Sequence, residues 1–157
     1  MAFELLTQAS QELLSQAAQL AANNHHATLQ PIHTVAAGLQ QDLCRSLFSI
    51  LDIPGNQLVN VLQEELSELP TLQRGKLTID PQLDKFIEEC KKQAEALKDS
   101  SIRLEHIILT WSTTNYLPQS LKEFFKKYGF THERILKQLR ELHKTTGTEG
   151  ADKQQYP

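Results

Sequence analysis

Two cysteines and six histidines are the side chains with which this chain of 157 residues could perform nucleophilic or metal chemistry. Cys44 could serve as a nucleophile if a histidine acted as its base, because the reactive form of the side chain is the thiolate. Cys44 and Cys90 both stand at apolar helical positions, however, where a free cysteine usually behaves as a small hydrophobic residue. They form neither a Cys-x-x-Cys motif nor a disulfide framework. We therefore expect both in the core, and we expect no catalytic residues.

The histidines allow a metal hypothesis and a structural one. His25 and His26 are neighbours in the sequence, so their side chains point apart, and no third ligand follows at helical spacing. A structural zinc site needs four ligands, so we expect these two residues to lie in a solvated turn. His33 and His106 each fall in the first turn of a short apolar helix, which favours packing or a hydrogen bond to the preceding turn. The sequence therefore predicts no metal site.

The charge balance argues against a nucleic-acid partner. The 16 basic and 19 acidic residues nearly cancel and give a net charge of −3, whereas a nucleic-acid surface needs an excess of lysine and arginine to neutralise phosphates. The last part of the chain is richer in lysine and arginine, but glutamates interleave with them, which is typical of ordinary surface alternation. The chain also lacks a Gly-x-x-x-x-Gly-Lys-Ser/Thr phosphate loop, so ATP hydrolysis by that route is excluded.

Membrane and secretory functions are excluded on similar grounds. No stretch approaches the roughly 18 consecutive apolar residues that cross a bilayer. Glu4 comes early, and glutamine and glutamate interrupt the first apolar stretch. The amino terminus therefore lacks the basic start and the apolar core of a signal peptide. We expect a cytoplasmic protein with no membrane partner.

The elements that must position these residues are helices. Leucine and alanine recur every three or four residues after Thr7, which is a good N-cap, and the pattern ends near Asn24. A second helix begins at Asp80 and Pro81, an N-cap followed by the residue favoured at the first helical position, and runs to about Leu97. The two helices resemble each other, which points to an internal repeat.

The whole chain is predicted to be a duplication. A shift of 73 residues places Thr7 on Asp80 and His33 on His106. After its long helix each half continues with a short apolar helix and two further helices. Residues 43–47 match residues 117–121 at a shift of 74, and the second half is about four residues longer before its last helix. The predicted fold class is all-α, with eight helices in two pseudo-symmetric four-helix repeats. Where the two halves meet, at the seam, we expect a groove suited to a peptide.

The predicted domain limits follow from this duplication. The first repeat covers residues 1–68 and the second covers residues 80–144. Residues 69–79 contain a proline and a glycine and form the linker between the repeats. Residues 145–157 are polar and unpatterned, which is typical of a flexible tail.

The doubled pattern resembles the Clp amino-terminal repeat domain, the module that leads the ClpA, ClpB and ClpC unfoldases. The resemblance runs from about Phe3 to about Leu142 and is carried by Leu-Gln-Pro-Ile-His at 29–33 and Ile-Arg-Leu-Glu-His at 102–106. ClpC-like modules carry Thr-Glu-His in both copies, with acidic groups implied in reading phosphoarginine, whereas the first copy here has isoleucine before its histidine. The Leu-Gln-Pro-Ile-His form is closer to ClpB, the ATP-driven disaggregase, and the tail is similar to the start of the ClpB linker before the first ATPase module.

The resemblance implies a substrate-recognition domain of a ClpB-type disaggregase, which binds unfolded or aggregated polypeptide and forms part of an ATPase ring. It also implies that Thr7, Asp99 and Glu105 contribute to substrate engagement. The residues by themselves indicate helix caps or helix-dipole partners at the same positions, and both roles stay open. ATP and magnesium would act only in ATPase modules outside this chain, so we expect neither enzymatic activity nor a cofactor here.

Three alternatives remain. The chain could be the adaptor-binding domain of a ClpA- or ClpC-type unfoldase of a Clp protease, or a stand-alone accessory protein with the same repeat. It could be an all-α enzyme or ligand carrier, which would retain a cofactor or a metal through purification. It could also be a structural spacer that binds no client. Tight binding of one folded adaptor favours the first alternative, whereas weak binding of many unfolded chains favours the disaggregase.

Overall fold

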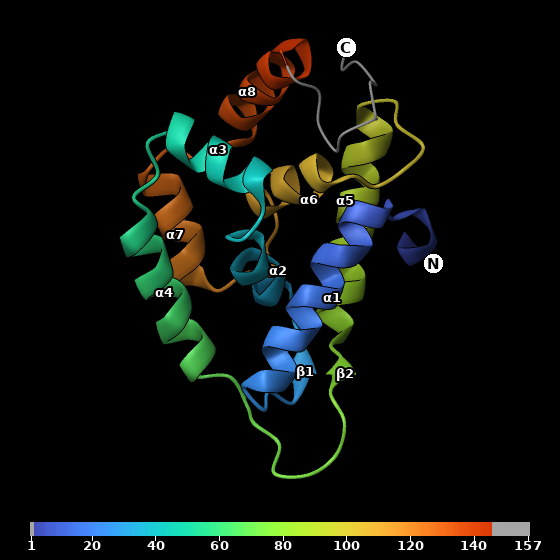
Figure 1. The fold of residues 1–157 in the computed structure, drawn as a ribbon, viewed down its shortest axis with the longest axis vertical. Helices are drawn as coiled ribbons and strands as arrows, with labels where there is room; N and C mark the ends of the chain where they lie inside the picture. The colour runs from blue at the N-terminus through green and yellow to red at the C-terminus, as the bar shows by residue number, and fades with distance from the viewer. Residues whose placement is uncertain (1, 146–157) are drawn as a thin grey trace.

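Eight α-helices make up most of residues 2–145, the part of the chain that the computed structural model describes (Figure 1). In chain order the helices are α1 (Gln8–Asn23), α2 (Pro31–Gly38), α3 (Asp42–Ile50), α4 (Gly55–Ser67), α5 (Pro81–Ala96), α6 (Leu104–Trp111), α7 (Gln119–Lys127) and α8 (His132–Thr145). The shorter elements are the 3-10 helix η1 (Ala2–Leu5) and the strands β1 (Thr28–Leu29) and β2 (Thr78–Ile79). The all-α prediction is confirmed. The predicted tail, 145–157, lies outside the described residues except for Thr145.

The two halves pack about a pseudo-two-fold axis. A shift of 73 residues converts the bounds of α1 into those of α5, and the bounds of α2 into those of α6. Helix contacts between the halves also come in matching pairs. α1 packs on α6 as α5 packs on α2, and α3 packs on α8 as α7 packs on α4. The predicted pair of four-helix repeats is therefore confirmed.

Two short backbone crossings tie the repeats together. β1 and β2 pair in parallel, with Leu29 opposite Ile79. Leu6 pairs in parallel with Ile102 at an isolated bridge, and the 73-residue shift converts the first pair into the second. At the second crossing the Thr7 N–H donates to the Ile102 carbonyl at 3.0 Å. Each crossing therefore ties the start of the long helix of one repeat to the turn before the short helix of the other.

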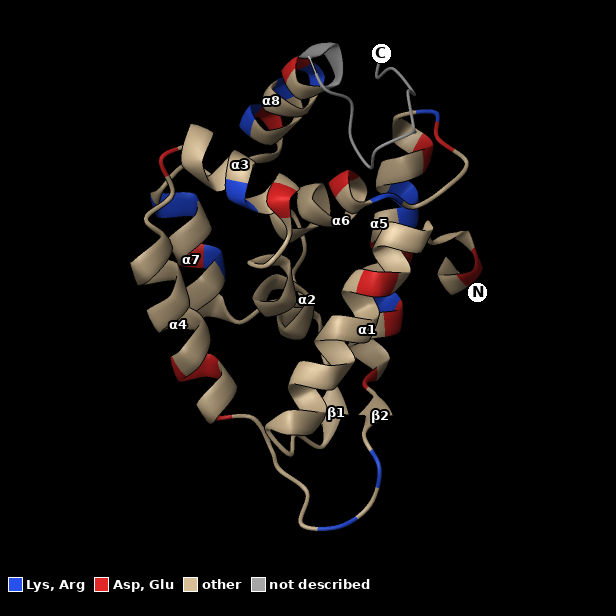
Figure 2. Cartoon of the chain, viewed as in Figure 1, with Lys and Arg blue, Asp and Glu red and all other residues tan. Residues whose placement is uncertain are grey.

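The core surrounds the two short helices α2 and α6. All eight residues of each are buried, and α2 carries no Lys, Arg, Asp or Glu (Figure 2). A helix that is largely apolar all round has to be covered by other elements, and the long helices α1 and α5 pack against α2 and α6 respectively. None of the described helices is long and apolar enough to span a membrane.

Cys44 on α3 and Cys90 on α5 belong to this core, as the sequence predicted. Burial raises the pKa of the Cys44 thiol to about 12 and also raises the pKa of the Cys90 thiol. A protonated thiol is a poor nucleophile, so both cysteines act as small hydrophobic side chains. Among the described side chains of residues 2–142, no three of His, Cys, Asp or Glu lie close enough together to hold a metal ion.

Trp111, the last residue of α6, closes the seam between the repeats at the two-fold axis. Its counterpart in the first repeat is Gly38, and a Cβ atom on Gly38 would lie 2.5 Å from Cη2 of the indole. The indole N–H donates to Thr34 Oγ1 on α2 at 3.0 Å. Equivalent positions that touch each other lie at the axis, so the seam pairs a large ring in one repeat with a glycine in the other.

The predicted position of the extra residues in the second repeat is wrong. The structure places them between α6 and α7, which residues 112–118 connect, whereas residues 39–41 connect α2 and α3. From α3 onward the repeats match at a shift of 77, which pairs Phe48 with Phe125, both buried. Leu43 and Leu47 are four residues apart, and so are Leu117 and Leu121. This shared spacing favoured the alignment of 43–47 with 117–121, at a shift of 74 instead of 77, and the alignment left the longer loop unrecognised.

Segment 69–79, the predicted linker, begins just after α4 and contains β2. Its Pro70 carbonyl accepts a hydrogen bond from the Ala27 N–H at 2.9 Å, so the segment is held against the turn that follows α1. The domain limits 1–68, 69–79 and 80–144 themselves stay a prediction.

Candidate functional site

Thr7 is the N-cap of α1 and lies at the crossing between the repeats. Its backbone is extended, with φ −66° and ψ 167°, and its side-chain oxygen accepts a hydrogen bond from the Ser10 N–H at 3.3 Å. The Ser10 hydroxyl donates to the Ile102 carbonyl at 2.9 Å, which is the carbonyl that the Thr7 N–H also reaches. The helix-cap hypothesis for Thr7 is confirmed, and the capped turn is bonded directly to the other repeat.

Asp99 and Glu105 meet at the guanidinium group of Arg103, next to the same crossing. Arg103 Nε lies 2.7 Å from Glu105 Oε1 and 3.6 Å from Asp99 Oδ2. Asp99 Oδ2 also lies 3.8 Å from His106 Nε2, and Asp99 Oδ1 accepts a hydrogen bond from the Ser101 N–H at 3.1 Å. The two acids, the arginine and the histidine are all buried. They form a buried ionic cluster between the end of α5 and the first turn of α6.

The structure thus brings the three residues singled out in the sequence to one region. Ile102, which accepts hydrogen bonds from the start of α1, is the neighbour of Arg103, which pairs with both acids. The acids therefore hold the turn before α6 in place, and a direct contact between these residues and a substrate stays a prediction. Sequence reasoning missed Arg103, although the acidic residues on both sides of it were a usable signal.

His26 is buried, so the expectation of a solvated His25–His26 turn is wrong for one of the two residues. His25 is exposed and has a left-handed backbone, with φ 57°, and this reversal of the chain turns the next side chain inward. His26 Nδ1 lies 2.9 Å from His33 Nε2, and His26 Nε2 lies 3.0 Å from the Leu66 carbonyl oxygen. The Gln30 N–H donates to His33 Nδ1 at 2.9 Å.

This series of hydrogen bonds fixes the tautomers of both rings. Because His33 Nδ1 is an acceptor, the proton of the neutral ring is on Nε2 and is donated to His26 Nδ1. His26 then carries its own proton on Nε2 and donates it to the Leu66 carbonyl at the end of α4. A further proton on His26 would place two N–H groups face to face. A further proton on His33 would lie on Nδ1 and face the Gln30 N–H, from which Nδ1 now accepts a hydrogen bond.

Positions related by the two-fold axis carry different chemistry. The 73-residue shift converts His26 and His33 into Asp99 and His106, and the second site also contains Arg103. In both sites the N–H that precedes the short helix donates to Nδ1 of the helix histidine at 2.9 Å. This confirms the predicted hydrogen bond to the preceding turn. The first site is a pair of histidines, whereas the second is an ionic cluster of two acids, an arginine and a histidine.

Folding stability is expected to fall as the pH drops from about 6.5 toward 4. Burial, and secondly the neighbouring His26, lower the pKa of His33 to about 4, whereas the unfolded chain takes up that proton near pH 6.5. The contribution of the neutral ring is fully present above the unfolded pKa, and it is lost as the unfolded state gains a proton that the native state does not bind. Between about pH 7.5 and about pH 4.5 we expect a loss of about 2–3 kcal/mol from this residue.

Urea unfolding at both pH values measures this loss, with His33→Gln as the reference. Other groups titrate in both proteins, so the relevant quantity is the difference between their pH dependences. The wild-type protein should lose more stability than the variant by the stated amount. Equal losses in the two proteins would contradict the assignment to His33.

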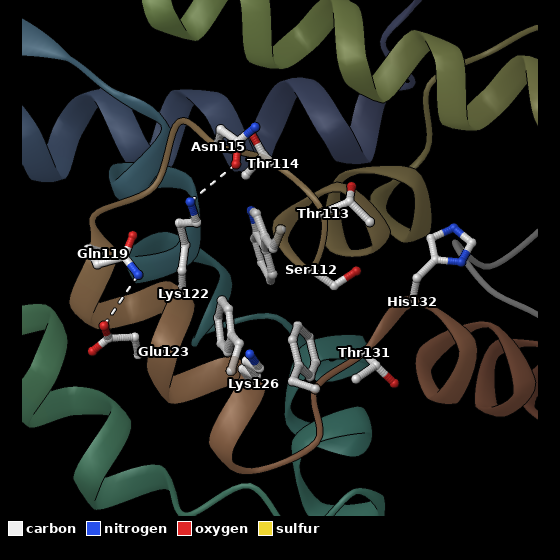
Figure 3. A pocket seen from close by; sticks show the side chains of 13 residues that line it. Ser112, Thr113, Thr114, Asn115, Gln119, Lys122, Glu123, Lys126, Thr131 and His132 are labelled. Carbon is white, nitrogen blue, oxygen red and sulfur yellow. Dashed lines mark hydrogen bonds between the residues drawn. The ribbon is translucent and has the colours of Figure 1, made fainter.

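A pocket of about 480 Å³ opens beside the longer loop of the second repeat, between α7, residues 112–115 and the start of α8 (Figure 3). Lys122 Nζ donates to Asn115 Oδ1 at 3.2 Å, and Gln119 Nε2 donates to Glu123 Oε1 at 3.3 Å. We call this cavity the α7 pocket. Its lining residues are Trp111, Ser112, Thr113, Thr114, Asn115, Gln119, Lys122, Glu123, Phe125, Lys126, Phe130, Thr131 and His132.

The α7 pocket lies within the second repeat rather than along the seam. Its aromatic residues nevertheless reach the seam, because the ring centroids of Phe130 and Phe48 on α3 lie 5.3 Å apart and Trp111 meets Gly38. Sequence reasoning missed this pocket, since its wall comes from the longer loop that the repeat alignment placed elsewhere. The expected groove along the seam stays a prediction.

Known protein families and sequences were compared with this chain. The model of the Clp repeat (R) N-terminal domain matches residues 5–124. The chaperone protein ClpB of Porphyromonas gingivalis is 25% identical over 137 residues, which cover 86% of this chain and 16% of that protein. ClpB of Bacillus cereus is 23% identical over 141 residues, which cover 85% of this chain and 16% of that protein. The chain therefore spans only about 16% of the length of these relatives.

Solved structures share the fold. The Hsp104 N-terminal domain from Candida albicans superposes with a TM-score of 0.73 at 20% identity, over 92% of this chain and 95% of that chain. The N-domain of ClpV from Vibrio cholerae superposes with a TM-score of 0.78 at 19% identity, over 96% of this chain and 89% of that chain. At these identities the likeness concerns the fold alone.

Proposed function

This chain belongs to the Clp repeat (R) N-terminal domain family, and on that premise we propose that it is the substrate-recognition domain of a ClpB-type disaggregase. In this proposal the domain binds unfolded or aggregated polypeptide and passes it to an ATPase ring. The match of both repeats to the amino-terminal part of ClpB chaperones carries the proposal. The ring, its ATP and its magnesium belong to the proposed parent, because the chain covers only a small part of those relatives.

The proposed client contact surrounds the crossing between Thr7 and Ile102. Thr7 is half-buried there, and Phe3 and Leu5 just before it are only partly buried against the core. Apolar surface and a polar edge therefore adjoin at this point, which suits an extended chain with exposed apolar side chains. Thr7 is the residue that we expect to touch the client.

Asp99 and Glu105 are buried and contribute to the same contact indirectly. Both acids pair with Arg103, and through it they fix the turn that carries the Ile102 carbonyl. We therefore assign them as positioning residues, which act on the client through the backbone that they hold.

Binding at such a surface should be weak and tolerant of sequence. Burial of apolar area contributes about 25 cal/mol per Å², and the ordering of the bound chain offsets much of that gain. A weakly held client is easily released, which suits a module that precedes a motor. A tether to the ring would keep the local concentration of clients high despite the low affinity.

A second candidate is a module that binds one defined peptide or adaptor. A ClpV N-domain has been solved in complex with a VipB peptide, and it shares this fold with a TM-score of 0.72. Adaptor binding in a ClpA- or ClpC-type unfoldase belongs to the same class. Such a module should bind one partner tightly at a fixed stoichiometry and should not bind unrelated unfolded chains.

Titration with reduced, carboxymethylated α-lactalbumin tests the first proposal, because that protein stays unfolded in buffer. Fluorescence anisotropy of the labelled client should show saturable binding with a dissociation constant of about 10 μM or weaker. The native, folded form of the same protein is the control and should not bind. Failure to bind the unfolded form at concentrations up to about 1 mM would contradict the proposal.

Two helix caps related by the two-fold axis provide a matched pair of variants. Thr7 caps α1 and Asp80 caps α5, and each accepts a hydrogen bond from an N–H in the first turn. Thr7→Ala and Asp80→Ala should each lower the free energy of unfolding by about 1 kcal/mol. Only Thr7→Ala should weaken client binding, by roughly threefold to tenfold. If the two variants weaken binding equally, the position of the contact is wrong.

A further inference from the structure

One wall of the α7 pocket comes from a loop that is longer in the second repeat than in the first. Residues 112–118 connect α6 to α7, and the matching connection in the first repeat is the shorter 39–41. The additional residues supply the wall that runs from Ser112 to Asn115. The pocket is therefore an addition to the duplicated scaffold, and none of the residues assigned above to the client contact lines it.

The inside of the pocket is aromatic and its rim carries a positive charge. Trp111, Phe125 and Phe130 all line it, and aromatic rings provide a large apolar contact area. Lys122 and Lys126 come from one face of α7, one turn apart (Figure 3). The positive charge of the rim contrasts with the charge of the whole chain, which is −3.

One acid stands beside these two lysines, so the rim keeps a net positive charge. Glu123 is the one acid among the described lining residues, and it accepts a hydrogen bond from Gln119 Nε2. Gln119 and Asn115, the hydrogen-bond partners of Glu123 and Lys122, are neutral amides and cancel neither charge. His132 Nε2 lies 2.9 Å from Gln93 Oε1, and burial lowers the pKa of His132, so its ring is neutral near pH 7.

We propose that the α7 pocket binds an acidic segment of a polypeptide, with one bulky apolar side chain against the aromatic rings and carboxylates paired with Lys122 and Lys126. The volume of about 480 Å³ lies within the range of about 300–1,000 Å³ that is usual for ligand pockets. The exposed positions of Thr113, Gln119 and Lys126 leave the rim open to solvent, so a chain can enter and leave the pocket. Two cations are too few for nucleic acid, which needs a longer track of phosphate contacts. This inference rests on the proposed function in that the ligand is a polypeptide.

Tryptophan fluorescence can report binding in this pocket, because Trp111 is the only tryptophan of the chain and lines the pocket. The probe is acetyl-Asp-Leu-Phe-Asp-amide, which contains both acidic groups and bulky apolar side chains. Two further peptides are matched to it, acetyl-Lys-Leu-Phe-Lys-amide with the charge reversed and acetyl-Asp-Ser-Ser-Asp-amide with the apolar side chains removed. The first peptide should change the emission of Trp111 saturably, and each of the others should bind at least about tenfold more weakly.

Charge reversal on α7 locates the site. The double variant Lys122→Glu/Lys126→Glu should bind the acidic peptide at least about tenfold more weakly than the wild type. Lys127→Glu is the matched control, because Lys127 lies on the same helix but 5.3 Å from the centroid of the Tyr128 ring and outside the pocket lining. This control should bind like the wild type. Raising the salt from about 0.15 M to about 1 M should weaken binding to the wild type, since the contacts at the rim are screened.

Three results would overturn the proposal: equal binding of the lysine peptide, equal binding of the serine peptide, or equal weakening by Lys127→Glu and the double variant. Titration of the same proteins with carboxymethylated α-lactalbumin separates this inference from the proposed function. If that client binds and the acidic peptide does not, only the α7 pocket proposal fails. If the acidic peptide binds and no unfolded client does, the pocket assignment stands and the proposed function fails.

Discussion

Replacing Trp111 with alanine is expected to lower the free energy of unfolding by about 3–5 kcal/mol. The side chain is almost fully buried, it meets Gly38 of the other repeat, and its N–H donates to Thr34 Oγ1. Its removal leaves a cavity at the two-fold axis, where both repeats contribute to the wall and neither can move without the other. Urea unfolding followed by far-ultraviolet circular dichroism measures the change, because the variant has no tryptophan to report by fluorescence.

Two variants show whether the loss arises at the seam. Trp111→Phe keeps a ring and loses the donor to Thr34, so we expect a smaller loss of roughly 1–2 kcal/mol. Gly38→Ala introduces a Cβ atom 2.5 Å from the indole, and this overpacking should cost about 1–3 kcal/mol in the wild-type background. In the Trp111→Ala background the same change should cost little, since the space is empty. Additive losses, or a loss below about 1 kcal/mol for Trp111→Ala, would contradict a tightly packed seam.

Replacing Glu105 with alanine is the second change with a large expected effect, a loss of about 3–5 kcal/mol. Glu105 Oε1 lies 2.7 Å from Arg103 Nε, and both side chains are buried. The other acid of the cluster is farther away, since Asp99 Oδ2 lies 3.6 Å from Arg103 Nε. A buried charge that loses a close partner is costly, because less of the penalty for taking it out of water is offset.

A double-mutant cycle isolates the pair. Arg103→Met keeps much of the apolar stem and removes the charge, so the double variant Arg103→Met/Glu105→Ala should lose less than the sum of the single variants by more than about 1 kcal/mol. Urea unfolding of the four proteins provides the values. If the losses simply add, the two side chains are not coupled and the positioning role of Glu105 is wrong.

The expected losses of stability limit which variants can test the client contact. A variant that removes Thr7, Asp99 and Glu105 together should be strongly destabilised, because two of the three side chains belong to a buried ionic cluster. A loss of binding in that variant would not separate contact from folding. The cap variants at Thr7 and Asp80 are better matched, since each removes one cap at a two-fold-related position.

The fold was predictable because its signals are local and occur twice. The N-caps Thr7 and Asp80, with apolar residues at helical spacing after each, define two long helices without reference to tertiary contacts. The duplication then supplies the arrangement, since two copies of an amphipathic unit bury their apolar faces most readily against each other. The match of α1 and α2 to α5 and α6 at one shift follows directly from the sequence.

The site was less predictable because its geometry depends on contacts between distant segments. The burial of His26 requires the left-handed residue before it and the carbonyl of Leu66, which lies 40 residues further along the chain. The α7 pocket depends on which loop is longer, and leucines spaced four apart allow two alignments of that region. The pairing of Arg103 with both acids needed the actual path of the turn before α6.

The amide NMR spectrum of the isotopically labelled domain, recorded with increasing amounts of carboxymethylated α-lactalbumin, shows whether the domain binds unfolded polypeptide and where. If the domain recognises unfolded polypeptide at the crossing between its repeats, the amide signals of Thr7 and of residues 101–104 should shift or broaden saturably while those of Asp80 and β2 stay in place. Unchanged signals throughout the titration, or equal changes at Thr7 and Asp80, would show that the domain does not recognise unfolded polypeptide at this crossing.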